Sequence, residues 1–191
     1  MTIYPKGYGP PGWVLKISDG AKTAVATFAA GCFWGVEEAF KRVPGVIGTR
    51  VGYIGGNTSN PDYRSVCRGD TGHAEACEVT FDSERVSYQQ LLEIFWNIHD
   101  PTQLNRQGYD VGSQYRSGIF YHDPEQKAMA ERSLKIIQSR YSRPVVTSVE
   151  PATRFWEAED YHQGYLAERP GGYCHVDMGK VDSIIRRMKE R

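Results

Sequence analysis

The residue best suited to chemistry in this sequence is Cys32, within the run Gly-Cys-Phe-Trp-Gly at positions 31–35. Residues 22–30 have the pattern of a buried strand, and residues 36–43 then carry apolar side chains at helical spacing. Cys32 should therefore lie where a strand turns into a helix. The positive end of a helix stabilises an anion, so we expect the pKa of this thiol to fall by roughly one unit, to near neutrality. The alternative is a buried structural cysteine.

Glu75 and two aromatic residues supply further candidate groups. In the predicted strand 74–81, period-two alternation places Glu75 on the same apolar face as Cys77. A desolvated carboxyl group favours its neutral form, which a general acid requires at pH 7; the alternative is an exposed glutamate at a strand end. Phe33 and Trp34 could wall an apolar pocket beside the thiol, although adjacent aromatic residues belong more often to a core.

Composition limits the classes of protein to which the chain can belong. The 191 residues predict a single domain over residues 21–191, preceded by an N-terminal arm over residues 1–20. With 23 basic and 23 acidic side chains, the chain has no net field to hold nucleic acid or an anionic membrane. A core of this size does not need disulfides, so the four cysteines are available for other roles.

No segment predicts membrane insertion. The uncharged stretch at residues 23–36 is shorter than the roughly 20 residues that a spanning helix needs. The small residues before Cys32 resemble a lipoprotein processing site, but an amphipathic helix follows instead of a polar tether. We therefore expect a cytoplasmic protein.

The order of the predicted elements indicates the fold class. Strand-like segments at 22–30, 46–54, 74–81, 114–122 and 144–150 alternate with helical patterns after Cys32, after Ser87, from Pro124 and from about Val181. This order predicts an α+β fold, a two-layer α/β sandwich with a mixed sheet, a ferredoxin-like core and a long irregular C-terminal segment. The Gly/Pro/Asn-rich segment between the second and third strands is expected to be a functional loop.

Several motifs, in order over about residues 22–178, strongly resemble the type A peptide methionine sulfoxide reductases. The matching segments are 31–37, 52–56, 63–67, 69–75, 99–102, 107–110, 114–117, 157–163 and 172–174. The resemblance implies an enzyme that reduces the S epimer of methionine sulfoxide, free or in proteins, and so repairs oxidative damage. We expect a monomer whose partners are oxidised proteins, free methionine sulfoxide and thioredoxin.

The resemblance also implies roles for individual residues. Cys32 attacks the sulfoxide sulfur and becomes a sulfenic acid as methionine leaves, while Glu75 supplies a proton to the oxygen. Tyr63 and Tyr115 match positions that hydrogen-bond this oxygen, although each tyrosine taken alone is more often a packing residue. Phe33 and Trp34 would enclose the methyl group of the substrate, and Asp110 would keep the site polar.

A second thiol must then reduce the sulfenic acid. Cys174 follows two glycines, so a mobile tail could bring its Cα within the ~7 Å that a disulfide requires, and the resemblance implies the same resolving residue. Cys67, in the functional loop, is a weaker candidate, and Cys77 should belong to the core. Because no cysteine follows Cys174, we expect an external dithiol to attack the Cys32–Cys174 disulfide directly.

The external dithiol would be thioredoxin, or dithiothreitol in vitro, and we expect no bound cofactor. The five histidines show no metal-ligand spacing, and the adjacent pair Cys174 and His175 lacks companions, so no metal site is predicted. Two other functions fit the residues. Cys32 could be an acyl-transfer nucleophile with His73 as its base, or the aromatic residues could bind thioether ligands without catalysis.

Overall fold

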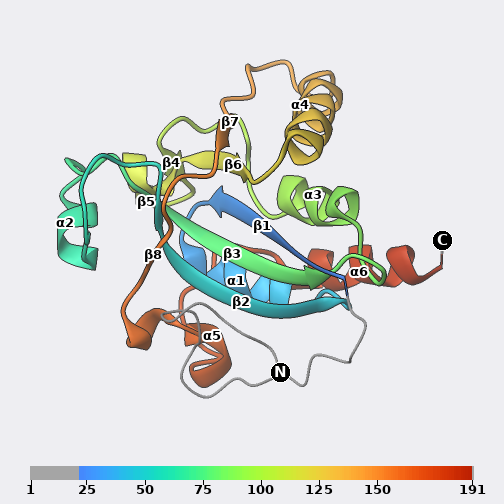
Figure 1. Cartoon of the computed structure of the whole chain (residues 1–191), viewed down its shortest axis with the longest axis horizontal. Coiled ribbons are helices and arrows are strands. Elements are labelled where there is room, and N and C mark those ends of the chain that lie inside the picture. The colour runs from blue at the N-terminus through green and yellow to red at the C-terminus, as the bar shows by residue number, and fades with distance from the viewer. Residues whose placement is uncertain (1–21, 191) are drawn as a thin grey trace.

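The computed structural model describes residues 22–190, in which one mixed sheet carries helices on one face (Figure 1). The strands run in the order β7-β6-β1-β3-β2-β8; only β6 and β7 pair in parallel. Their bounds are β1 (Thr23–Ala30), β2 (Val46–Ile54), β3 (Ala74–Asp82), β6 (Ser117–Tyr121), β7 (Ser148–Pro151) and β8 (Trp156–Glu157). The predicted α+β fold with a mixed sheet is confirmed.

The helices and a small hairpin complete the fold. The helices are α1 (Phe33–Lys41), α2 (Tyr63–Cys67), α3 (Tyr88–Asn97), α4 (Pro124–Gln138), α5 (Tyr165–Glu168) and α6 (Met178–Lys189), with 3-10 turns η1 (Ser113–Tyr115) and η2 (Asp160–His162). Strands β4 (Arg106–Gln107) and β5 (Asp110–Val111) form a separate hairpin. Strands β6-β1-β3-β2, connected through α1 and α3, have the order and antiparallel pairing of a ferredoxin-like unit.

Helices α1, α3 and α6 cover one face of the sheet, where the main core lies. Phe28 of β1 is fully buried there, with ring centroids 5.0 Å from Phe40 of α1 and 5.2 Å from Phe95 of α3. Burial of one such ring contributes about 1.5–3 kcal/mol. Ala29 points to the opposite face, where it packs in a smaller cluster with Phe120. The end of β1 is thus held from both sides, which positions the turn into α1.

Several element boundaries differ from the sequence prediction for local reasons. The strand predicted over 114–122 begins at Ser117, because residues 113–115 form the turn η1. The last helix begins at Met178 because Asp177 caps it by accepting a hydrogen bond from the backbone N–H of Lys180. The predicted functional loop contains α2, which the reciprocal hydrogen bonds of Asp62 and Ser65 cap. The predicted arm over residues 1–20 lies outside the described residues.

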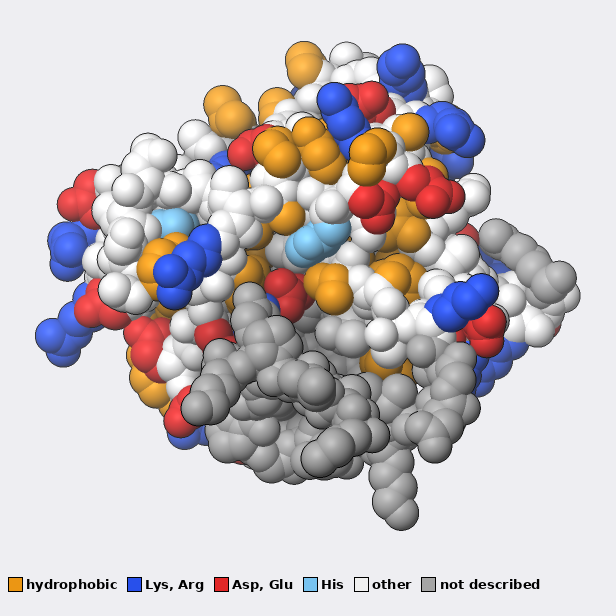
Figure 2. Space-filling model, in the orientation of Figure 1, with side chains coloured by type: hydrophobic (Ala, Val, Ile, Leu, Met, Phe, Trp, Pro, Cys, Tyr) orange, Lys and Arg blue, Asp and Glu red, His pale blue; other side chains and the backbone are white. Residues whose placement is uncertain are grey.

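The surface agrees with a chain of zero net charge. On the face in Figure 2, the described acidic and basic side chains are interspersed, without a field of one sign. Among residues 22–190, no helix is long and apolar enough to cross a membrane, and no group of three or more potential ligands could hold a metal ion.

Candidate active site

Cys32 lies at the turn from β1 into α1, where the sequence places it. It is the residue before the first helical turn, and the whole residue is 7% exposed. The preceding Gly31 has φ +90, and a β-carbon there would lie 2.8 Å from the side chain of Gln107. Only glycine fits this backbone and this contact. The turn at Gly31, just before Cys32, therefore packs against Gln107 of the β4–β5 hairpin.

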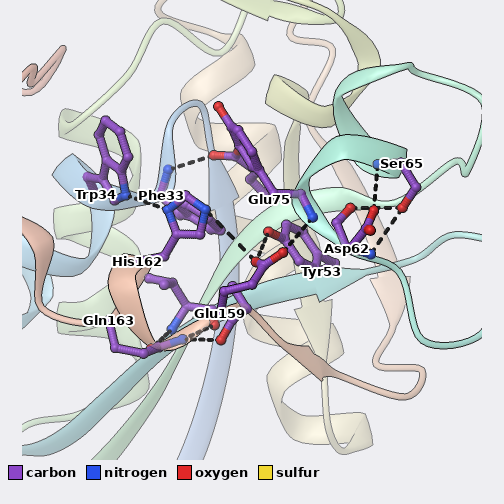
Figure 3. A network of polar contacts seen from close by, with 12 residues as sticks. Phe33, Trp34, Tyr53, Asp62, Ser65, Glu75, Glu159, His162 and Gln163 are labelled. Carbon is purple, nitrogen blue, oxygen red and sulfur yellow. Dashed lines mark hydrogen bonds and ion pairs between the residues drawn. The ribbon is translucent and has the colours of Figure 1, made fainter.

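Glu75 lies beside the same helical turn. It is 1% exposed, and its Oε2 accepts a hydrogen bond of 3.1 Å from the backbone N–H of Phe33 (Figure 3). Burial raises the pKa of Glu75 to about 8, and the charge of Asp110 acts in the same direction, while the Phe33 N–H opposes the rise. Glu75 is therefore mostly neutral at pH 7 and holds a proton in a site with little water. The predicted inward orientation of this side chain is observed.

The prediction that the helix lowers the pKa of Cys32 is wrong. Burial raises the pKa of the thiol above its ordinary range, the charge of Glu75 raises it further, and the backbone N–H of Trp34 opposes the rise. The sequence argument considered the helix dipole but could not show that the thiol is buried. In addition, Glu75 already occupies the first N–H of the helix. At neutral pH Cys32 is thus a thiol.

Tyr63, Tyr115 and Asp110 come from three separate segments. Tyr63 begins α2, Tyr115 ends η1, and Asp110 lies on β5. Burial raises the pKa of both tyrosines, and the charge of Glu75 contributes to each rise. Their hydroxyls therefore keep their protons and can donate hydrogen bonds. Asp110 accepts a hydrogen bond of 2.9 Å from the hydroxyl of Tyr173, and its charge acts on Cys32, Glu75 and Tyr115.

The two aromatic residues after Cys32 are held rigidly. Phe33 is 1% exposed and packs with Tyr53, their ring centroids 5.9 Å apart. The indole Nε1 of Trp34 donates a hydrogen bond of 3.1 Å to Nδ1 of His162, and its ring stacks on Tyr165 at 3.8 Å. Both partners of Trp34 come from the C-terminal segment. Tyr53 of β2 thus fixes the orientation of the Phe33 ring, and His162 and Tyr165 of the C-terminal segment fix that of Trp34.

Glu159 connects the segments that surround the site (Figure 3). Its carboxylate accepts hydrogen bonds from the hydroxyl of Tyr53 at 2.8 Å and from the backbone N–H of Tyr63 at 2.7 Å. Although burial opposes it, these hydrogen bonds lower the pKa of Glu159, which remains charged at neutral pH. The sequence reasoning assigned no role to Glu159 or His162. Their spacing of three residues within the recognised 157–163 motif was the only available signal.

Cys174 lies over the first turn of α1. Its Sγ is 3.1 Å from the position that a β-carbon on Gly35 would occupy, and the thiol donates a hydrogen bond of 3.5 Å to the carbonyl of Val176. Cys77 is completely buried in the main core, and Cys67 is exposed at the end of α2. All four cysteines are free. The absence of a side chain at Gly35 thus leaves space for the Cys174 sulfur one turn from Cys32.

His73 does not have the geometry of a catalytic base for Cys32. Its Nδ1 accepts a hydrogen bond of 3.1 Å from the backbone N–H of Gly56, and its Nε2 lies 2.8 Å from the carbonyl of Thr58. With both ring nitrogens engaged in the loop after β2, His73 has no free lone pair. Its role in this structure is to hold that loop.

Comparisons with known proteins agree with this arrangement. The family model described as peptide methionine sulfoxide reductase matches residues 24–191. The chain belongs to this family, as a type A member. The peptide methionine sulfoxide reductase MsrA of Methanoculleus marisnigri is 58% identical over 153 residues, which cover 79% of this chain and 93% of the relative.

Two solved structures share the fold. Reduced Mxr1 from Saccharomyces cerevisiae has a TM-score of 0.78 and 34% identity, with 82% of this chain and 92% of Mxr1 covered. Methionine sulfoxide reductase A of Corynebacterium diphtheriae has a TM-score of 0.73 and 38% identity, and the match covers 80% of this chain and 77% of that protein. The chain is therefore a methionine sulfoxide reductase, an oxidoreductase and not an acyl-transfer enzyme.

Proposed function

We propose that this protein reduces the S epimer of methionine sulfoxide, free or in proteins, through a sulfenic acid on Cys32. The observation that carries this proposal is the pairing of a buried thiol at the start of α1 with a neutral Glu75 bound to the next backbone N–H. A sulfoxide needs a nucleophile on sulfur and a proton on oxygen, and these two groups supply both.

The first step exchanges the sulfoxide oxygen between two sulfur atoms. Cys32 Sγ attacks the substrate sulfur while Glu75 donates its proton to the oxygen, and the Cys32 thiol proton returns to Glu75. Collapse of this intermediate breaks the substrate S–O bond and leaves the OH on Cys32. The substrate sulfur gains two electrons and leaves as methionine, while the Cys32 sulfur loses two. Because Glu75 regains its proton, the raised pKa of Cys32 does not prevent the step.

The residues around Cys32 suit the rest of the substrate. Tyr63 and Tyr115 keep their hydroxyl protons and can hydrogen-bond the sulfoxide oxygen. Phe33 and Trp34 supply apolar surface for the methyl group, and the contacts of Trp34 to His162 and Tyr165 fix that surface. Asp110 keeps the site polar. Oxidised polypeptides and free methionine sulfoxide both carry the group that these residues bind.

Recycling proceeds through a disulfide between Cys32 and Cys174. The position of Cys174 against Gly35 favours it over Cys77, which is enclosed in the core. A thioredoxin then reduces the disulfide by thiol exchange, as dithiothreitol would in vitro. Mxr1 has also been crystallised in complex with Trx2, a structure that is 24% identical to this chain with a TM-score of 0.56, and this favours a thioredoxin as the dithiol.

This cycle uses protein thiols and an external reductant, so we propose an enzyme that needs no bound cofactor or metal. Residues 21–191 would form the single catalytic domain, with residues 1–20 as an additional arm. Four free cysteines suit a reducing compartment, the cytoplasm. We also propose a monomer.

Peptide mapping tests the disulfide. After one equivalent of the S sulfoxide is added without reductant, the digest should contain a Cys32–Cys174 linked pair and unlinked Cys67 and Cys77. The Cys174→Ser variant should release one methionine per chain, give no linked pair, and fail to turn over with thioredoxin. A dominant Cys32–Cys67 linkage in the wild type would contradict the assignment.

A further inference from the structure

His175, the residue after Cys174, contributes a buried nitrogen that the mechanism above does not use. Its Nε2 lies 2.8 Å from the backbone carbonyl of Ala30. A carbonyl oxygen only accepts hydrogen bonds, so Nε2 carries the proton and Nδ1 of the neutral ring carries a lone pair. This Nδ1 is buried and has no hydrogen-bond partner. An unpaired buried acceptor is costly to a fold, and functional sites are where such groups persist.

The lone pair of His175 and the Cys174 sulfur both lie against Gly35. A β-carbon on Gly35 would be 3.6 Å from His175 Nδ1 and 3.1 Å from Cys174 Sγ. At the other end of the ring, Nε2 is 3.1 Å from the corresponding position on Gly31. The imidazole therefore lies along the turn that carries Cys32, between the two glycines, with its free nitrogen on the Cys174 side.

Cys174 needs an acceptor for its proton. Burial raises the pKa of this thiol, so it is protonated at neutral pH, and its proton now points to the Val176 carbonyl. A carbonyl does not take a proton from a thiol. Burial also lowers the pKa of His175, although the Ala30 carbonyl and the charge of Asp110 oppose the fall, and the ring is thus neutral and able to act as a base at pH 7.

We propose that His175 Nδ1 is the general base of the resolving step, accepting the thiol proton of Cys174 as its sulfur attacks Cys32. This inference rests on the proposed sulfenic acid. In the step, the Cys174 sulfur forms a bond to the Cys32 sulfur, the S–O bond of Cys32 breaks, and the hydroxide leaves with the proton from His175 as water. The sulfur atoms of Cys32 and Cys174 are left joined in one disulfide, and His175 returns to its neutral form.

Charged and titratable groups around His175 bear on its pH dependence. Asp110 on β5 favours its protonation, and His99, after α3, lies close enough to interact with it. His99 is itself buried and its pKa is lowered to about 4, so it is neutral at pH 7. The protonation state of His175 near neutrality therefore follows its own burial, the Ala30 carbonyl and the charge of Asp110.

Rapid-quench kinetics on the full-length enzyme separates the two steps. One equivalent of the S sulfoxide is added without reductant, and methionine, disulfide and dimedone-trapped sulfenic acid are measured over time. In His175→Gln, whose amide can still donate to the Ala30 carbonyl, disulfide formation should slow by about 10²-fold. Sulfenic acid should accumulate while methionine is released. His122→Gln, the same change at a histidine bonded to Thr27 on the other side of the sheet, should alter neither step.

The pH dependence of disulfide formation in the wild-type enzyme is a second test, and it requires no variant. With His175 as base, the rate constant for conversion of the sulfenic acid to the disulfide should be flat from pH 7 to 9 and fall in acid as the imidazole gains its proton. This constant is fitted separately from sulfenic acid formation, which slows above pH 8 as Glu75 loses its proton. Without a base, the constant for disulfide formation should rise about tenfold per pH unit with the Cys174 thiolate. That rise, or a wild-type rate of disulfide formation in His175→Gln, would overturn the inference, as would loss of methionine release in that variant. If wild-type enzyme releases no methionine, the proposed function itself fails.

Discussion

Replacing Cys32 by Ser is expected to abolish methionine formation, with a loss on the order of 10⁶-fold, the size of effect seen when a covalent nucleophile is removed. A serine hydroxyl is far less nucleophilic toward sulfur than a thiol, and it cannot become a sulfenic acid. The fold should tolerate the change, because Cys32 makes no side-chain cap on α1. Methionine released from the S sulfoxide with excess dithiothreitol measures the effect.

Cys77→Ala is the matched control for the loss of a thiol. Cys77 lies in the core on β3 and has no role in the proposed cycle. This variant should lose some stability to the cavity, about 1 kcal/mol, and keep its rate of methionine formation. Substantial reduction by Cys32→Ser, or inactivity of a folded Cys77→Ala, would contradict the assignment of the nucleophile.

Replacing Glu75 by Gln should slow methionine formation by about 10²–10⁴-fold, the usual contribution of a general acid. The glutamine carbonyl can still accept the Phe33 N–H, so the position of the helix should be kept. What the variant loses is the acidic proton. Single-turnover release of methionine at pH 7 measures this step without interference from recycling.

The pH dependence of that step has a definite sign. Since the pKa of Glu75 is raised to about 8, its acidic form predominates below pH 8 and disappears above it. The wild-type rate should therefore fall about tenfold per pH unit above pH 8, and the Glu75→Gln rate should show no such fall. Glu78→Gln, on the same strand and paired with Arg50, is the control and should keep the wild-type profile. A Glu75→Gln variant with the wild-type rate and pH profile would exclude Glu75 as the acid.

The sequence was sufficient to predict how the nucleophile and the acid are positioned. The strand pattern before Cys32 and the helix pattern after it located the turn, and period-two alternation in β3 placed Glu75 on the buried face. Such local periodicities predict elements well, because each reports which side of one segment is buried. The motifs then supplied the family and, with it, the expected roles of Tyr63 and Tyr115.

Contacts between distant segments could not be predicted in the same way. The hydrogen bond from Tyr53 to Glu159 joins residues 106 positions apart, and that from Tyr63 to the same carboxylate spans 96. Neither residue carries a local signal of its partner. The raised pKa of Cys32 depends on burial by the fold, which the helix-dipole argument did not include. The free nitrogen of His175 likewise depends on the distant Ala30 carbonyl.

Stereochemistry tests the central claim most directly. The S and R epimers of a methionine sulfoxide substrate are supplied separately to the wild-type enzyme with excess dithiothreitol, and methionine is quantified. The arrangement of Cys32, Glu75 and the aromatic residues should reduce the S epimer and leave the R epimer unchanged. Reduction of only the R epimer, or of neither, would contradict this account.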